Sequence, residues 1–485
     1  MGWVHNGPVS TRLSPSGRRW FVSAILLVGV TGASLGAAQA GAAHARTSTS
    51  VGRVATTDWP AYLDGPSHDS FNAGDGTITP ANASALKQKW SFTTGNGYFS
   101  SPTVFDGAVF IGANNGWFYK LSAANGTVVD KIFLGTNPVL SCQPPPTGIV
   151  STATASLNPS TKVPTVYVSG ANGYLYAMRA SNLAVEWKSV IAIRSTKVND
   201  YYDWSSPTVA GGRIYIGVSS NCDKPLVRGG LISYDQTTGK RLGEFYTVPS
   251  GKVGGSIWSS IAVGSNGDVY ASTGNGPLGS PAEQLLGYSE SIIKLSPTLQ
   301  FLARFQVPSA QEGQDTDFGA SPVLFGPYVG ACNKNGVFYA LSQTTMKLAW
   351  QRQVSDSDYG LEACIATPAW NGKHLFFVTP AIKLGGTSYT GTVQERDPSG
   401  PLVWVAGLPN ALDGSPTLDG DGVLAAGTYD EQPTPNATYL LDAANGHILR
   451  NVVTGGDFAQ SVFAEHWLFV ANQNGVSAWG AGPLG

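Results

Sequence analysis

The stretch that decides the fold is residues 100–121, which reads SSPTVFDGAVFIGANNGWFYKL. A hydroxyl residue followed by proline opens a short apolar run. Two further runs rich in β-branched and aromatic residues follow, separated by Asp-Gly and Asn-Gly pairs. Such runs, bounded by turn-forming pairs, predict β-strands joined by tight turns. The 3.6-residue periodicity of an amphipathic helix is not visible in them.

An opening of this kind, a small hydroxyl residue that is usually followed by proline, occurs eight times along the chain. The hydroxyl residue stands at Ser101, Thr152, Ser206, Ser260, Ser321, Thr367, Ser415 and Ser461. Successive copies lie 46 to 61 residues apart, a period typical of solenoids and propellers. Because each unit holds strand-like runs and turns in the same order, four strands to a unit, each unit corresponds to one propeller blade.

The two ends of the repeat array complement each other. The eighth unit, which begins at Ser461, lacks its fourth strand, and the run 87–92 (KQKWSF) stands alone before the first unit. Pairing that run with the eighth unit would close the ring and leave no open sheet edge. The sequence therefore predicts an all-β fold: a single eight-bladed β-propeller over residues 58–485, with four-stranded blades and with the N-terminal strand completing the last blade.

The composition agrees with this prediction. The chain has 60 Gly and 30 Pro, 11% aromatic residues and only 12% charged residues, which is typical of a compact, turn-rich β protein and not of a disordered one. A net charge of −2 provides no basic surface for nucleic acid, so we expect no nucleic-acid partner.

Residues 1–45 differ in character from the rest. Arg18 and Arg19 precede an apolar stretch at 20–30, and Ala-x-Ala sites follow. We expect residues 1–45 to be a signal peptide, either of the twin-arginine type or an ordinary secretory signal, and 46–57 to be a flexible linker rich in Ser and Thr. No other segment is apolar over a membrane-spanning length. The protein is therefore expected outside the cytoplasm, secreted, periplasmic or on the cell surface.

The four cysteines of an exported protein are expected to form disulfides. Cys142 and Cys364 precede inner strands, whereas Cys222 and Cys332 follow second strands, and both kinds of loop open on one face of a propeller. This favours the pairs Cys142–Cys222 and Cys332–Cys364, although the sequence alone permits three connectivities. No Cys-x-x-Cys-His motif occurs, so no covalent haem is expected, and the six histidines show no metal-binding spacing.

Over residues 58 to 480 the chain resembles the quinoprotein alcohol dehydrogenases, eight-bladed propellers that hold pyrroloquinoline quinone (PQQ) and calcium at the ring axis. It is similar in particular to secreted PQQ-repeat proteins, among them the polyvinyl-alcohol dehydrogenases. The lead-in segments Asp58-Trp59-Pro60 and 78–82 (ITPAN) carry this resemblance together with the repeats. Non-catalytic propellers share the repeats, so the repeats imply the fold more strongly than an activity.

Two segments resemble the family's cofactor and calcium sites. The segment 255–260 (GSIWSS) resembles the one whose Trp lies under the quinone ring, which implies that role for Trp258. Trp204 occupies the matching place one blade earlier, so a purely structural aromatic remains an alternative. The segment 272–277 (STGNGP) resembles a loop that supplies an Asn oxygen to calcium, which implies Asn275 as a ligand. A simple hairpin turn is the alternative.

Two further segments imply catalytic groups. The segment 315–318 (DTDF) resembles the one with the family's catalytic base, which implies that Asp317 accepts the alcohol proton and touches the metal. A solvated or capping carboxylate is the alternative. The segment 332–336 (CNKNG) resembles the loop whose cation contacts the quinone oxygens, which implies this role for Lys334. The alternative is an ordinary surface lysine.

The chain also departs from the family pattern. Many members place two adjacent cysteines over the quinone, but the matching region here, 141–144 (SCQP), has a single Cys, and the Arg that follows in the family is replaced near Thr147-Gly148. In the third blade Arg228 matches a cofactor-binding Arg, but Lys224 stands where calcium's Glu is expected, with Asp223 one position away. The resemblance therefore implies Asp223 as a substitute metal ligand.

Two classes of function follow from these observations. The first is an exported PQQ- and calcium-dependent dehydrogenase that oxidises an alcohol or a hydroxylated polymer and passes electrons to a separate acceptor. The second is a non-catalytic propeller that binds a protein or a polysaccharide. No motif of a hydrolase stands out. The two classes differ in Asp317 and Lys334, which only an enzyme needs to bring together at the axis.

Overall fold

The computed structural model describes residues 57–482 except 95–99, 138–146, 194–199, 278–280, 312–314, 357–362, 430–434, 453–454, 457–458 and 474. The chain divides into two compact units, residues 1–53 and 54–485, and every described residue belongs to the second. The expected signal peptide (1–45) and residues 46–56 of the expected linker lie outside the described residues. In the part of the chain that is described, no helix is long and apolar enough to cross a membrane.

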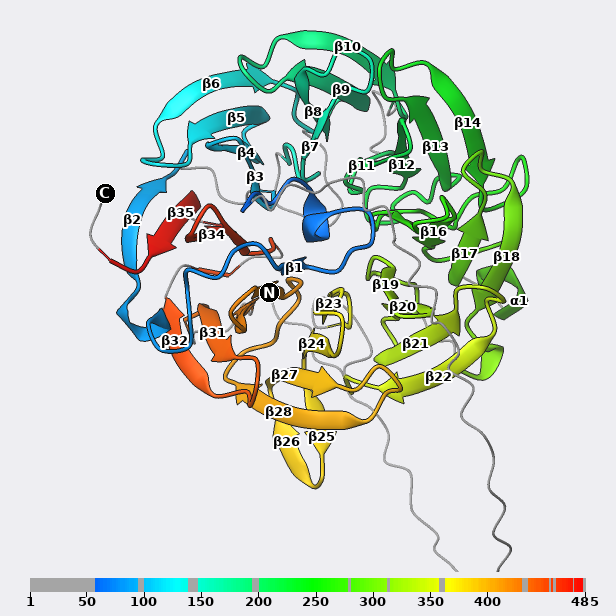
Figure 1. The fold of residues 1–485 in the computed structure, drawn as a ribbon. Helices are drawn as coiled ribbons and strands as arrows, with labels where there is room; N and C mark the ends of the chain where they lie inside the picture. Colours follow the sequence, from blue (N-terminus) through cyan, green and yellow to red (C-terminus); the bar gives the residue numbers. More distant parts are fainter. Residues whose placement is uncertain are drawn as a thin grey trace, which may run out of the picture. The chain divides into compact units, whose positions relative to one another are not determined.

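The described unit is the predicted propeller: eight four-stranded antiparallel sheets arranged in a ring (Figure 1). Blade one comprises β3 (Thr103–Phe105), β4 (Ala108–Gly112), β5 (Trp117–Ser122) and β6 (Val128–Phe133). Blade two comprises β7 (Thr154–Leu157), β8 (Pro164–Ser169), β9 (Tyr174–Arg179) and β10 (Val185–Val190). Blade three comprises β11 (Thr208–Ala210), β12 (Arg213–Val218), β13 (Gly230–Asp235) and β14 (Arg241–Tyr246). Blade four comprises β15 (Ala262–Val263), β16 (Val269–Ser272), β17 (Ser291–Leu295) and β18 (Phe301–Gln306).

The remaining blades carry two additions. Blade five comprises β19 (Val323–Phe325), β20 (Tyr328–Cys332), β21 (Val337–Ser342) and β22 (Leu348–Gln353). Blade six comprises β23 (Ala369–Trp370), β24 (Leu375–Thr379), β27 (Gly391–Arg396) and β28 (Leu402–Leu408), with an inserted hairpin, β25 (Ile382–Leu384) and β26 (Thr387–Tyr389). Blade seven comprises β29 (Thr417–Asp419), β30 (Val423–Gly427), β31 (Thr438–Asp442) and β32 (Ile448–Val452), extended by β1 (Phe71–Asn72), which pairs parallel to β29. The short helices of the described part are η1 (Tyr62–Asp64), η2 (Ala83–Ala85), α1 (Pro281–Gln284) and η3 (Ser309–Gln311).

The eighth blade confirms the predicted ring closure. It consists of β33 (Val462–Ala464), β34 (Trp467–Asn472) and β35 (Gly475–Gly480), and its outer strand is β2 (Lys87–Phe92) from the other end of the chain. β2 pairs antiparallel with β35, with Phe92 opposite Val476. The two ends of the repeat array are thus joined in one sheet, and the ring has no unpaired blade edge at this junction.

The core lies between neighbouring blades. Inner strands are buried on both faces, as in β12, whereas outer strands such as β14 are half exposed. One core cluster joins Tyr167 and Leu175 of blade two to Ile214 and Ile232 of blade three. Because each sheet buries both of its faces against its neighbours, the strands are rich in consecutive apolar residues and do not alternate strictly.

The repeated hydroxyl residue links one blade to the next. The backbone N–H of Thr152 donates to Ser206 Oγ at 3.0 Å, Ser206 N–H to Ser260 Oγ at 3.0 Å, and Ser260 N–H to Ser321 Oγ at 2.9 Å. Thr367 N–H donates to Ser415 Oγ at 3.0 Å in the same way. The residue recurs because its side chain satisfies a buried N–H of the preceding blade, where an unpaired donor would be costly.

Residues 57–70 cross the ring and contact nearly every blade (Figure 1). Their backbone forms hydrogen bonds with Val104, Ala155, Val263, Leu324, Trp370, Leu418 and Glu465, which belong to blades one, two, four, five, six, seven and eight. The sequence did not predict this arrangement. We call residues 57–70 the axial strap. These backbone contacts lie within the inner strands or just after them.

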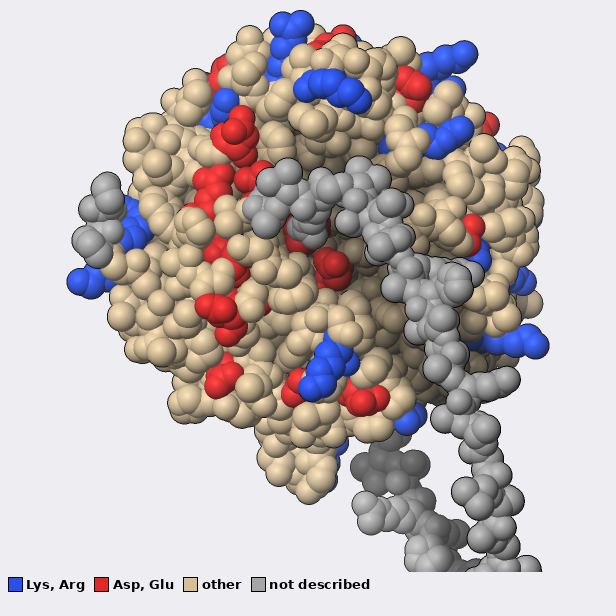
Figure 2. All heavy atoms as spheres, in the orientation of Figure 1, with Lys and Arg blue, Asp and Glu red and all other residues tan. Residues whose placement is uncertain are grey.

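A band of carboxylates lies on the face that the strap crosses (Figure 2). Asp58 belongs to the strap, and the backbone N–H of Glu465 donates to the Thr57 carbonyl of the strap. Burial raises the pKa of both carboxyl groups, and the charge of Asp106 raises each further. These acids are separate from the acidic cluster described next.

Candidate functional site

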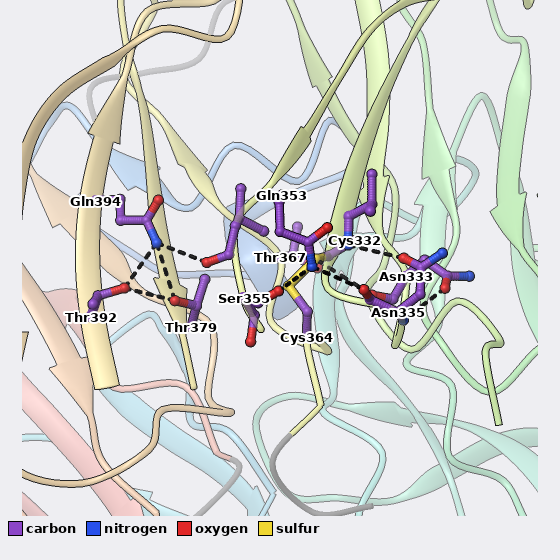
Figure 3. The surroundings of a disulfide bond; sticks show 12 residues. Cys332, Asn333, Asn335, Gln353, Ser355, Cys364, Thr367, Thr379, Thr392 and Gln394 are labelled. Carbon is purple, nitrogen blue, oxygen red and sulfur yellow. Dashed lines mark hydrogen bonds between the residues drawn. A yellow bond between two sulfur atoms is a disulfide. The ribbon is translucent and has the colours of Figure 1, made fainter. Parts of the chain in front are cut away.

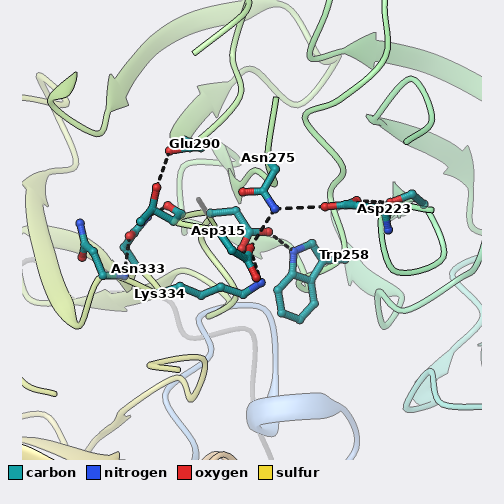
Figure 4. Close-up of polar contacts among 11 residues, drawn as sticks. Asp223, Trp258, Asn275, Glu290, Asp315, Asn333 and Lys334 are labelled. Carbon is teal, nitrogen blue, oxygen red and sulfur yellow. Dashed lines mark hydrogen bonds and ion pairs between the residues drawn. The ribbon is translucent and has the colours of Figure 1, made fainter. Parts of the chain in front are cut away.

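Five of the predicted site residues come from loops that open on one face of three consecutive blades. Asp223 follows β12, Trp258 precedes β15, Asn275 follows β16, Asp317 precedes β19 and Lys334 follows β20. Within a blade, the segment that leads into the first strand and the turn after the second strand emerge at the same end. The fold therefore gathers these side chains, as Figure 4 shows.

Asp317 is the centre of the cluster. Its Oδ2 accepts a hydrogen bond from Trp258 Nε1 at 2.7 Å, and its Oδ1 forms an ion pair with Lys334 Nζ at 2.8 Å. The Lys334 ammonium also lies 5.3 Å from the centre of the Trp258 ring, within cation–π range. Three residues from blades four and five thus fix one another, although they are far apart in the sequence.

A second carboxylate shares the lysine. Lys334 Nζ donates to Asp315 Oδ1 at 2.8 Å, and Asn275 Nδ2 donates to the same oxygen at 2.9 Å. Asn275 Nδ2 also donates to Asp223 Oδ2 at 3.1 Å. A continuous polar network therefore runs from blade three to blade five through Asn275. Asn275 and Asp223 were predicted from the sequence as metal ligands, whereas no role was predicted for Asp315.

The charges and burial of this network shift its pKa values. Burial raises the pKa of Asp317 to about 6, and the neighbouring Asp315 and Asp223 raise it too, whereas Lys334 works in the opposite direction. Burial also disfavours ionisation of Asp315, but the charge and hydrogen bonds of Lys334 hold its pKa below the usual value. Burial would lower the pKa of Lys334, yet Asp317 and Asp315 keep it above its usual range. Lys334 is therefore a permanent cation, while Asp317 titrates near neutrality.

Hydrogen bonds from neighbouring loops hold the segment 315–317 in place. Thr316 Oγ1 donates to Glu290 Oε2 at 3.1 Å, and Asn333 Nδ2 donates to the Thr316 carbonyl. The backbone N–H of Lys334 donates to the Asp317 carbonyl at 3.0 Å. These contacts hold the segment in the position where Asp315 and Asp317 both reach Lys334 Nζ. Sequence reasoning missed Glu290, Thr316 and Asn333, because only the register of neighbouring loops brings them together.

A glycine allows the Trp258 indole to lie close to the next blade. A Cβ atom built on Gly319 would come within 2.8 Å of Trp258 Cη2 and 2.5 Å of Ile365 Cγ2. Both distances are shorter than any real Cβ contact, so only glycine fits here. Trp258, Gly319 and Ile365 belong to blades four, five and six, and their contact shows that these positions converge towards the ring axis.

One predicted disulfide is confirmed. Cys332 and Cys364 are bonded, with their Cα atoms 5.7 Å apart (Figure 3). The bond ties the loop that carries Lys334 to the segment leading into blade six. The other expected pair, Cys142–Cys222, involves Cys142, which lies outside the described residues, so that pair stays a prediction. The segment 141–144, where the family's adjacent cysteine pair is missing from the sequence, also lies outside the described residues.

Arg228 lies apart from the contacts of the cluster. Its guanidinium stacks over the Tyr246 ring at 4.0 Å, and its Nε donates to the Val248 carbonyl at 3.0 Å. Both partners belong to the outer part of blade three. Its cofactor-binding role therefore stays a prediction from resemblance. Of the other predicted ligands, Asp223 reaches Asn275 as described, and its Oδ1 accepts a hydrogen bond from Ser220 Oγ.

The oxygen atoms of the cluster could bind a hard cation such as calcium only if further oxygen ligands complete its coordination. Asp315 and Asp317 contact the Lys334 ammonium, and Asp223 joins them through Asn275 Nδ2. The buried Oδ1 of Asn275 has no hydrogen-bond partner within the described residues. An oxygen in that state suits a calcium-type ion. Within the same residues, however, no group of three or more His, Cys, Asp or Glu is arranged to hold a metal by itself.

Comparisons with known proteins support the fold. Neither the family models nor the curated proteins searched contain a match to the sequence. Among solved structures, the quinohemoprotein alcohol dehydrogenase of Comamonas testosteroni is 16% identical, with a TM-score of 0.67 over 88% of this chain and 81% of that chain. A europium-containing methanol dehydrogenase is also 16% identical, with a TM-score of 0.67 over 87% of this chain and 90% of that chain.

A third similar structure is not named as a dehydrogenase. BamB from Moraxella catarrhalis is 14% identical, with a TM-score of 0.51 over 81% of this chain and 97% of that chain. The fold is thus the eight-bladed propeller of the quinoprotein dehydrogenases. At these identities the likeness establishes the architecture alone, and the chemistry has to be argued from the cluster.

Proposed function

We propose that the protein is a PQQ-dependent dehydrogenase that oxidises an alcohol and passes the electrons to a separate acceptor. The observation that carries the proposal is the joint contact of Asp317 with Trp258 Nε1 and Lys334 Nζ, at 2.7 and 2.8 Å. A base, a fixed cation and an aromatic ring are the three parts that such a reaction needs from the protein.

Each residue has a defined task in this proposal. The half-buried ring of Trp258 offers a flat surface for a planar ring system. PQQ, when bound there, supplies the two-electron acceptor. Lys334 stabilises negative charge that develops on an oxygen near its Nζ, and its two carboxylate partners hold it in place. Asp317 accepts the hydroxyl proton of the alcohol, because a carboxyl group that titrates near pH 6 is ionised at neutral pH and still basic enough to bind a proton.

A calcium ion would bind beside Asn275. The Oδ1 atom of Asn275 is the buried oxygen without a hydrogen-bond partner in the described structure, and Asp223 and Asp317 are the nearest predicted carboxylate ligands. The excess of carboxylates over cations gives a divalent ion a favourable electrostatic environment. Since the side chains alone do not complete a site, we propose that the ion binds together with the cofactor, whose oxygens supply the missing ligands.

We further propose that the protein acts outside the cytoplasm, which rests on the signal-like sequence of residues 1–45. No haem-attachment motif occurs in the chain, so the electrons would leave through a separate acceptor. A hydroxylated polymer is an alternative to a small alcohol as the substrate.

The test is a titration of the purified protein with PQQ in the presence and absence of calcium, followed by tryptophan fluorescence and calorimetry. We expect saturable binding that requires calcium, is lost in Trp258→Ala and is weakened in Lys334→Gln. Trp117→Ala is the matched control, because Trp117 is also half-buried but packs against Phe133 in blade one. Absence of calcium-dependent binding would leave a non-catalytic propeller as the better description.

A further inference from the structure

The repeat places one residue per blade in the segment that leads into the innermost strand. This residue stands two positions before the repeated hydroxyl, and we call the set the axial ring. Its members in blades two, three, four, six, seven and eight are Val150, Trp204, Trp258, Ile365, Asp413 and Ala459. In blade five the position is Gly319, and the side chains of Trp258 and Ile365 both lie close to this glycine. The equivalent residue of blade one lies outside the described residues.

The axial ring is mainly apolar. Val150, Trp204, Trp258, Ile365 and Ala459 are all half-buried, whereas the one acid, Asp413, is only 4% exposed. By contrast, Asp223, Asn275, Asp315 and Lys334 lie in the adjacent loops of blades three to five. The site thus combines polar side chains from the loops of blades three to five with the mainly apolar side chains of the axial ring. A ligand that matches both would have a polar end and an apolar body.

Trp204 is the largest apolar group of the ring besides Trp258, and it is held rigidly. Its Nε1 donates to the Ser220 carbonyl at 3.2 Å, and its ring packs edge-on against Tyr202 with the centroids 4.7 Å apart. Ser220 Oγ in turn donates to Asp223. The indole is therefore fixed beside the polar network, while part of its surface stays exposed and available to a ligand.

We propose that Trp204 is a specificity-determining residue that contacts the body of the substrate, and that the preferred substrates are alcohols with an apolar or aromatic body. This inference rests on the proposed function, because it takes Asp317 as the group that meets the hydroxyl. Sugar alcohols would leave their hydroxyl groups facing Val150, Trp204 and Ile365 without hydrogen-bond partners, which disfavours them. Methanol would be too small to contact Trp204.

The experiment uses saturation-transfer NMR on the purified protein with benzyl alcohol, methanol and mannitol as probes, so the readout does not depend on turnover. We expect benzyl alcohol to bind and to lose about tenfold in affinity in Trp204→Ala, while Trp204→Phe stays within about threefold of wild type. Mannitol should show no binding. Trp117→Ala serves as the control, and circular dichroism verifies that each variant is folded.

Kinetics with PQQ-loaded protein provide the second readout. Trp204→Ala should raise KM for benzyl alcohol about tenfold and leave KM for methanol unchanged. Equal affinity of wild type and Trp204→Ala for benzyl alcohol, or equal binding of mannitol, would overturn the inference. If PQQ binds as proposed and Trp204→Ala has no effect, this inference alone fails. If neither PQQ nor benzyl alcohol binds, the proposed function fails with it.

Discussion

At the scale of the residue, the behaviour of Asp317 results from two opposing effects. Burial disfavours its charged form, and Lys334 favours it; burial prevails and raises the pKa to about 6. A carboxylate that is buried at a cost, next to a fixed cation and an indole N–H, is unusual in a purely structural loop and typical of functional sites. Asp315 shows the opposite balance, because it is more exposed and Lys334 lowers its pKa.

The first prediction concerns Asp317 and pH. Because the folded-state pKa lies above the unfolded value, the stabilisation from this group is fully present below about pH 4 and is lost as pH rises through about 6. In metal-free buffer, the unfolding free energy of wild type should therefore fall relative to Asp317→Asn by about 1–3 kcal/mol between pH 4 and pH 7. Urea unfolding at several pH values measures this.

The control is Asp268→Asn, which removes another aspartate paired with a lysine, Lys294, at 2.7 Å. This variant shows how much the loss of an aspartate–lysine ion pair by itself changes the unfolding free energy. A constant difference between wild type and Asp317→Asn over this pH range would contradict the assignment of an elevated pKa.

The sequence predicted these residues only in part. Trp258, Asn275, Asp317 and Lys334 could be singled out because the segments that carry them resemble segments of the quinoprotein alcohol dehydrogenases. Thr316 and Glu290 could not, since their contact depends on how two loops of adjacent blades meet. Arg228 shows the reverse: its local sequence matches, but its side chain stacks on Tyr246, and no local pattern reveals that.

At the scale of the element, the loop that leads into blade five is shaped by Gly319. Gly319→Ala would push its new methyl group into the Trp258 and Ile365 side chains. We expect a loss of about 1–3 kcal/mol in stability and a change in tryptophan emission as the indole is displaced. Chemical unfolding and fluorescence spectra measure both effects. Gly427→Ala is the matched control, because a Cβ there meets no atom within 4 Å; equal effects in both variants would refute the steric account.

A second feature at the scale of the element is the hydroxyl residue that opens each repeat unit. Ser260→Ala removes the acceptor of the Ser206 N–H, which is buried, and should lower the unfolding free energy by about 1–3 kcal/mol. Ser399→Ala, which alters an exposed turn hydroxyl, should change it by less than about 0.5 kcal/mol. Thermal denaturation compares the two, and a neutral Ser260→Ala would mean that the linkage between blades is not needed.

The period of this hydroxyl was sufficient to predict the blades, because it reports a contact that recurs between several successive blades. The inserted hairpin β25–β26 and the strand β1 were not predicted. Neither is part of the repeat, and short runs such as Phe71–Asn72 carry no periodic signal of their own.

At the scale of the whole molecule, the axial strap and the shared eighth blade hold the ring together. The strap is anchored in part by His68, whose Nδ1–H donates to the Pro322 carbonyl at 2.8 Å, and whose burial lowers the pKa to about 4. From the sequence, residues 57–70 could be placed before the first blade but not across the ring, because backbone groups make most of the contacts and leave no pattern in the side chains.

His68 predicts an acid sensitivity of the whole ring. Its folded pKa lies below the unfolded value, so its neutral form contributes fully above about pH 6.5, and stability is lost as pH falls towards 4. This loss should reach roughly 3 kcal/mol at pH 4 and should be absent in His68→Asn. Asn can adopt the positive φ of 60° at this position and can donate to the Pro322 carbonyl. Parallel pH profiles of the two proteins in urea unfolding would refute this role.

The measurement that tests the central claim most directly is a single turnover of the PQQ-loaded protein with a primary alcohol, followed by the absorbance of the cofactor. With wild type, the alcohol should change the cofactor spectrum at a rate that rises as pH passes through about 6. Asp317→Asn should bind the cofactor but react at least about 100-fold more slowly. A loaded protein whose spectrum does not respond to any alcohol, or an Asp317→Asn variant that reacts as fast as wild type, would contradict the account.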